Sequence, residues 1–113
     1  MIKLYHNPRC KKSREALNFL QSSGHNFDIV LYLNEKLTQA ELREIIQKLK
    51  IRPEKLIRTE ETLWKTQFKG KSLSDSQLIN LLIQEPRLIQ RPIVVLGDKA
   101  VIARPAVAIN LLF

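Results

Sequence analysis

The stretch that decides the fold runs from Ile2 to Leu33 and reads IKLYHNPRCKKSREALNFLQSSGHNFDIVLYL. Ile2–Tyr5 predicts a short buried strand, and Ser13–Ser22 has the i, i+3, i+4 apolar spacing of an amphipathic helix. Gly24 is suited to ending that helix. Phe27–Leu33 is rich in β-branched and aromatic residues, which predicts a second strand. Two strands joined by one helix form a βαβ unit with parallel strands and a right-handed crossover.

The middle of the chain carries helix signals. Thr38 with Glu41, and Ser74 with Gln77, have the spacing of capping boxes, and Pro53 suits the first turn of a short helix. Together with the apolar spacing, these signals predict helices from Thr38 to Leu49, from Pro53 toward Arg58, from Glu60 to Phe68, and from Ser74 to Ile83, with Pro86 as the stop.

The end of the chain predicts two further strands. Ile93–Leu96 and Ala100–Ala103 are separated by Gly97-Asp98-Lys99, which has the length and residues of a hairpin turn. After Pro105, Ala106–Leu112 predicts a last helix. This order of elements predicts an α/β, thioredoxin-like fold: a four-stranded mixed sheet with flanking helices. We expect one domain over residues 1–113, with a helical insert at about 38–85.

Bulk properties narrow the class of protein. The chain of 113 residues has the size of one domain, and no apolar run is long enough to span a membrane. Its first residues do not resemble a secretory signal, and one cysteine cannot form an internal disulfide, so we expect a cytoplasmic protein. The net charge of +8 is spread and interleaved with Glu, which favours solvated surface over nucleic-acid binding. We expect a monomer that binds neither nucleic acid nor membrane.

Cys10, the only cysteine, lies between the first predicted strand and the first predicted helix. Amide groups at a helix N-terminus favour negative charge, and Arg9, Lys11, Lys12 and Arg14 crowd the same turn. Both influences lower a thiol pKa from about 8.5 toward neutrality, as a nucleophile requires. The alternative is a small, buried and inert cysteine.

Three arginines stand where the chain changes structure. Arg58 lies at a predicted helix end, Arg91 precedes Pro92 before the third strand, and Arg104 precedes Pro105 after the fourth. Guanidinium groups offer paired donors to a tetrahedral oxyanion, so these residues would form an anion clamp around the Cys10 sulfur. Alternatively, they are surface arginines whose apolar stems pack on neighbours. The Arg91–Pro92 bond is predicted to be cis, although a trans bond before an edge strand is the other interpretation.

The two histidines differ in position. His6 precedes Cys10 by four residues, and a protonated imidazole there would stabilise a thiolate; otherwise it is a hydrogen-bonded structural residue. His25 lies in a predicted turn and is expected at the surface. One Cys and two His have no metal-ligand spacing, so neither a metal nor another tightly bound cofactor is expected.

Four segments together resemble the glutaredoxin-dependent arsenate reductase family: the run from His6 to Arg14, Leu56-Ile57-Arg58, Arg91–Val95, and Arg104-Pro105. The resemblance covers nearly the whole chain in the same order. It implies a thioredoxin-like fold, a catalytic thiol at Cys10 with assistance from His6 and Ser13, and oxyanion binding by Arg58, Arg91 and Arg104. It further implies arsenate as substrate, glutathione as co-substrate and glutaredoxin as partner, in arsenical resistance.

This chain departs from the resembled pattern at Arg9, Lys11 and Lys12, where those enzymes often carry small residues. A thiol phosphatase is disfavoured, because its C-x5-R loop would need arginine where Ala16 stands. An Spx-type regulator that binds RNA polymerase remains an alternative, although Ser13 replaces the second thiol of its Cys-x-x-Cys switch. A monothiol glutathione-linked oxidoreductase is the other alternative.

Overall fold

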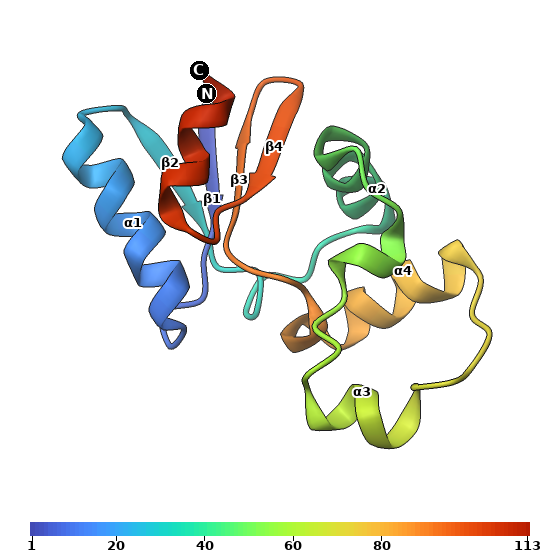
Figure 1. The fold of residues 1–113 in the computed structure, drawn as a ribbon. Coiled ribbons are helices and arrows are strands. Elements are labelled where there is room, and N and C mark those ends of the chain that lie inside the picture. The colour runs from blue at the N-terminus through green and yellow to red at the C-terminus, as the bar shows by residue number, and fades with distance from the viewer. The chain divides into compact units, whose positions relative to one another are not determined.

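The protein, described over residues 1–113 by a computed structural model, divides into two compact units (Figure 1). The first, which we call the sheet unit, comprises residues 1–35 and 91–113. The second, the helical unit, comprises residues 36–90. The predicted helical insert, 38–85, falls within the helical unit, while the assignment of the whole chain to one domain stays a prediction.

The sheet unit is built on four strands in the order β2-β1-β3-β4. Strand β1 (Ile2–Tyr5) pairs in parallel with β2 (Phe27–Val30) and antiparallel with β3 (Ile93–Leu96), which pairs antiparallel with β4 (Lys99–Ile102). The predicted mixed, thioredoxin-like sheet is therefore confirmed. Helix α1 (Lys11–Ser23) connects β1 with β2, and it ends at Gly24, whose φ of 77° is the left-handed conformation that glycine tolerates.

Strand β2 is shorter than predicted. It ends at Val30 rather than Leu33, because the register pairs Val30 with Tyr5, the last residue of β1. Beyond that point the chain turns, and the carbonyl of Leu31 accepts hydrogen bonds from the N–H groups of Asn34 (3.0 Å) and Glu35 (2.9 Å). A strand cannot continue where its only neighbour has ended.

The hairpin between β3 and β4 is tighter than predicted. Lys99 pairs with Leu96 and belongs to β4, so only Gly97 and Asp98 form the turn. Gly97 has a φ of 60°, as the first central position of a type II′ turn requires. The last predicted helix is present over Ala106–Leu112, but as a 3-10 helix, η3.

The core of the sheet unit lies on one face of the sheet. Helix α1 and η3 pack against each other and against the central strands (Figure 1). The buried residues of this core are Ile2, Leu4, Ala16, Leu20, Val94, Ala103, Ile109 and Leu112. The Cys10 turn lies between β1 and the start of α1, and this core fixes the positions of these two elements relative to each other.

The helical unit contains α2 (Gln39–Leu49), η1 (Pro53–Leu56), α3 (Thr62–Gln67), α4 (Asp75–Gln84) and η2 (Pro86–Leu88). Both predicted capping boxes are present, at the starts of α2 and α4. The predicted helix from Pro53 is a 3-10 helix, and α3 is shorter than the predicted 60–68. An antiparallel bridge between Ile57 and Ile89 joins the segments that follow η1 and η2.

Both Arg-Pro peptide bonds are cis. The prediction for Arg91–Pro92 is confirmed, and Arg104–Pro105, for which no such prediction was made, has the same geometry.

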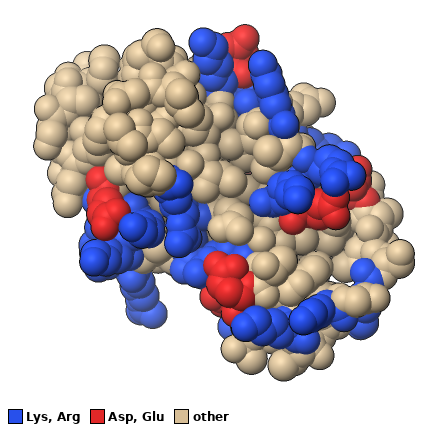
Figure 2. Space-filling model, in the orientation of Figure 1, with Lys and Arg blue, Asp and Glu red and all other residues tan.

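The Lys and Arg side chains visible on one face of the molecule agree with the spread that the sequence indicated. On the face drawn in Figure 2 they lie in separate groups with Asp and Glu among them, not as one continuous patch. None of the helices combines the length and the apolar character that a crossing of the bilayer would need.

Candidate active site around Cys10

The Cys10 turn follows directly from β1. The N–H of His6 donates to the carbonyl of Val30 (2.9 Å), which extends the β1–β2 pairing by one residue. The chain then folds back, with the N–H of Cys10 donating to the Asn7 carbonyl (3.0 Å) and that of Arg9 to Asn7 Oδ1 (3.0 Å). Cys10 is the N-cap of α1 and has extended backbone geometry (φ −94°, ψ 123°), so the unbonded amides of the first helical turn lie next to its side chain.

The Cys10 thiol is partly exposed and has a lowered pKa. Burial alone would raise this pKa, because it disfavours the charged thiolate. That effect is outweighed by the backbone N–H of Ser13, by a hydrogen bond from Arg91 and its positive charge, and by the N–H of Lys12. A partly exposed thiol with a lowered pKa does not match the buried, inert alternative, and the role of Cys10 as a nucleophile stays a prediction.

Arg91 and Arg104 flank the same end of the β3–β4 hairpin. The first residue of β3, Ile93, pairs with both Tyr5 at the end of β1 and Ile102 at the end of β4. The N–H of Ala103 also donates to the carbonyl of Pro92 (2.8 Å). The sheet register therefore brings the segments that carry Cys10, Arg91 and Arg104 to the same end of the sheet. Of the two arginines, Arg91 lowers the pKa of the Cys10 thiol, whereas the side chain of Arg104 is exposed.

His6 and Ser13 form a buried polar pair beneath the turn. His6 Nδ1 lies 2.6 Å from Ser13 Oγ, and Ser13 Oγ also accepts the N–H of Asn7 (3.0 Å). Ser13 has no exposed surface, and His6 and Asn7 are exposed by only 5% and 8%. This pair ties the end of β1 to the first turn of α1.

The charge state of His6 differs from the predicted one. Burial lowers the pKa of His6 from 6.5, and the positive charge of Arg14 lowers it further. A neutral imidazole at pH 7 cannot stabilise the thiolate as an imidazolium, so this predicted mode of action is disfavoured. The structural interpretation, a hydrogen-bonded histidine, is the one that the geometry supports, and a catalytic role for His6 stays a prediction.

Arg58 belongs to the helical unit. Its Nε and Nη1 contact Glu60 Oε1 (3.1 Å) and Glu61 Oε2 (3.0 Å), and its side chain is exposed by only 14%. The sequence did not reveal that two carboxylates hold this guanidinium. The participation of Arg58 in an anion clamp around Cys10 stays a prediction.

From the sequence, Asn7 has no predicted role of its own, and Arg14 is predicted to act on the thiol rather than on His6 and Pro8. Asn7 organises the turn through its carbonyl, its side chain and its N–H, and Arg14 donates to the carbonyl of Pro8 (3.0 Å) while its charge acts on His6. Asn-Pro before a helix is a turn signal that would have pointed to Asn7. No group of three or more His, Cys, Asp and Glu side chains is placed to hold a metal ion.

The arrangement defines a class of thiol protein: one ionisable cysteine at a helix N-cap of a thioredoxin-like sheet, with a guanidinium beside the sulfur. A profile described as the ArsC family matches residues 5–111. The chain belongs to the ArsC family, which confirms the family resemblance found in the motifs.

Individual relatives agree with this assignment. "Uncharacterized protein YfgD" of Escherichia coli K12 is 42% identical over 106 residues, which cover 92% of this chain and 89% of the relative. "Arsenate reductase" of Haemophilus influenzae is 40% identical over 104 residues, which cover 90% of each chain.

The same agreement holds for solved structures. The arsenate reductase from Vibrio cholerae superposes with a TM-score of 0.94 at 34% identity, covering 99% of this chain and 97% of the other. The putative arsenate reductase from Yersinia pestis superposes with a TM-score of 0.91 at 38% identity over the full length of both chains.

Proposed function

We propose that this protein reduces arsenate to arsenite, with Cys10 as the nucleophile and glutathione and glutaredoxin as the sources of electrons. The observation that carries the proposal is the thiol at the N-cap of α1, whose pKa is lowered with the help of Arg91. Similarity over nearly the whole chain to relatives named arsenate reductase supports the choice of oxyanion.

In the proposed reaction, the Cys10 thiolate attacks the arsenic atom of arsenate, and one oxygen leaves as water after taking up protons. Arg91 stabilises negative charge on the remaining oxygens, and we assign the same role to Arg58 and Arg104. A glutathione thiolate then attacks the Cys10 sulfur. The electron pair of the sulfur–arsenic bond passes to arsenic, which is reduced from the +5 to the +3 state and leaves as arsenite.

The remaining product is a mixed disulfide between Cys10 and glutathione. This chain has no second cysteine that would resolve it, so a thiol of another molecule is required. We assign that step to glutaredoxin, whose thiolate attacks the glutathione sulfur and releases the Cys10 thiolate. A cytoplasmic location, where reduced glutathione is abundant, belongs to the same proposal.

The test measures arsenate-dependent oxidation of glutathione by the purified protein with glutaredoxin present. Cys10→Ser is expected to abolish the reaction, and Arg91→Ala to lower kcat/KM roughly 10²- to 10³-fold, as loss of one oxyanion donor does. Arg43→Ala, which removes an arginine that binds Ser76 on α4, is the matched control and should react like the wild type.

Two outcomes would overturn the proposal. Glutathione oxidation that does not respond to arsenate but proceeds when a glutathione mixed disulfide is supplied as the oxidant would identify a general monothiol oxidoreductase instead. Arsenite formation by Cys10→Ser at the wild-type rate would remove the thiol from the chemistry.

A further inference from the structure

The helical unit contains a pocket of its own, with a volume of about 490 Å³. This volume lies within the range of about 300–1,000 Å³ that is common for sites of small molecules. The pocket is lined entirely by residues between Arg52 and Gln90, and none of them has a role in the reaction proposed above.

One part of the lining is apolar and aromatic. It is formed by Ile57, Trp64, Leu73 and Leu78. Trp64 stacks on Phe68 with ring centroids 6.1 Å apart and an interplanar angle of 24°, so the position of the indole is supported from the next turn of the chain. An indole among aliphatic side chains favours a flat apolar group as ligand.

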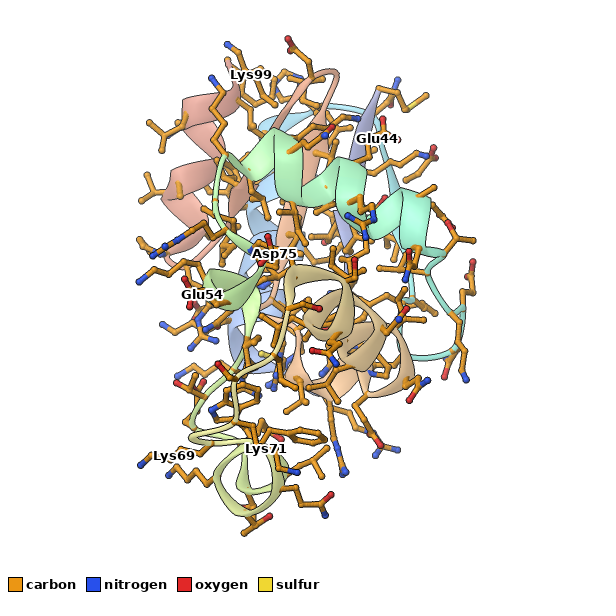
Figure 3. All side chains as sticks on the ribbon, turned by 90° about the vertical axis from the view of Figure 1, so that its right-hand side faces the viewer. Glu44, Glu54, Lys69, Lys71, Asp75 and Lys99 are labelled. Atoms are coloured by element: carbon orange, nitrogen blue, oxygen red, sulfur yellow. The ribbon has the colours of Figure 1, made fainter.

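The other part of the lining is polar with a net positive charge, and it consists of Arg52, Glu54, Lys55, Thr59, Lys71 and Gln90. Arg52 is neutralised by Glu54, since its Nη2 lies 3.0 Å from Glu54 Oε1. Lys55 and Lys71 have no such carboxylate partner, and the ammonium of Lys71 lies 5.6 Å from the centroid of the Phe68 ring. The lining therefore carries two uncompensated positive charges next to its aromatic surface. Figure 3 labels Glu54 on η1 and Lys71 on the segment that follows α3.

We propose that this pocket binds a small aromatic carboxylate. The ring would lie against Trp64 and the aliphatic residues, while the carboxylate would accept hydrogen bonds from Lys55 and Lys71. An inorganic oxyanion such as arsenate has no apolar body that would use the aromatic wall. The pocket would thus bind a ligand of a different chemical class from the substrate proposed for Cys10.

The probe for the test is 1-naphthoate, with 1-naphthylmethanol as a neutral control of similar shape. Trp64 is the only tryptophan, so its indole N–H gives a single signal in a ¹H–¹⁵N spectrum. We expect saturable shifts of that signal with naphthoate, and at least about fivefold weaker binding of naphthylmethanol, which lacks the charge.

Substitutions then identify the charges involved. Lys55→Gln combined with Lys71→Gln should weaken naphthoate binding roughly tenfold, as loss of charge-assisted contacts does. Lys69→Gln is the matched control, because Lys69, which Figure 3 labels together with Lys71, is an exposed lysine that is not part of the pocket lining. Its affinity for naphthoate should equal that of the wild type.

Several results would overturn this inference: equal affinities for the two probes, an unchanged affinity in the double variant, or shifts confined to the sheet unit. Cys10→Ser should bind naphthoate like the wild type. Failure of arsenate reduction therefore leaves this inference standing, and failure of naphthoate binding leaves the proposed reaction standing.

Discussion

Cys10 shows how a single residue depends on its surroundings for its chemistry. Burial of the thiol works against ionisation, and only the amides of the first helical turn together with Arg91 reverse that effect. The amides belong to the backbone of α1, so they lower the pKa of the thiol in every variant in which this helix is intact. Arg91 is the contributor that a substitution removes cleanly.

Arg91→Ala is therefore expected to raise the pKa of Cys10, because the thiolate loses a hydrogen bond and a positive charge while its burial cost remains. The rate of alkylation by iodoacetamide, measured against pH, reports the thiolate fraction. The variant should reach its half-maximal rate at higher pH than the wild type. Arg9→Ala should not shift this profile, because the exposed Arg9, whose charge the sequence predicted to act on the thiol, is not among the groups that lower the pKa of Cys10. Coinciding profiles for Arg91→Ala and wild type would contradict this assignment.

At this scale the sequence predicted that Arg91 lies beside Cys10, but it did not predict the surroundings of His6 and Arg58. Cys10 at a helix start and Arg91 before a strand follow from local sequence, and the structure places them together. The state of His6 could not be predicted, because it depends on burial and on Arg14, which the turn brings near. The engagement of Arg58 by Glu60 and Glu61 was also hidden, since a sequence does not show which charges a side chain reaches.

At the scale of elements, the two helix starts that capping boxes mark were predicted more accurately than the end of β2. A capping box is a local signal, and both boxes appear where Thr38 and Ser74 indicated them. The end of β2 depends on the length of its neighbour β1, which is a tertiary property. The end of α2 had no glycine to mark it: Lys50 adopts the left-handed conformation there, with a φ of 57°.

Lys50→Gly should stabilise the protein by about 0.5–1 kcal/mol, because glycine adopts positive φ without the steric cost of a Cβ. Gln47→Gly is the matched control within the same helix, and it should destabilise by about 1 kcal/mol through loss of helix propensity. Urea denaturation of both variants measures the free energy of unfolding. A lower free energy of unfolding in Lys50→Gly would contradict this prediction, because it would mean that the lysine side chain stabilises the protein by more than the positive φ destabilises it.

At the scale of the whole molecule, stability should depend on pH through His6. The unfolded chain takes up a proton near pH 6.5, while the folded protein does so only at lower pH. The unfolded state thus binds more protons below pH 6.5, and the stabilisation that is present above this pH is lost as the pH falls toward the lowered folded pKa.

His6→Asn removes this dependence. The wild type is expected to be more stable than the variant at pH 7.5, because the variant loses well-fitted buried contacts. That difference should shrink as the pH is lowered to 5, since only the wild type loses the His6 contribution. Urea titrations at several pH values measure it. Gln21→Ala, an exposed change on α1, should differ from the wild type by an amount that does not vary with pH. A constant difference for His6→Asn would contradict the lowered pKa.

The division of the chain has a consequence for the order of events during translation. The helical unit is one continuous segment, 36–90, and all of it is synthesised before β3 and β4 exist. Strand β1 emerges first, yet its antiparallel neighbour consists of residues 93–96. Strand β1 is therefore flanked on both sides only after residues 93–96 have been synthesised. Closing so long a loop is the step that we expect to limit the rate of folding.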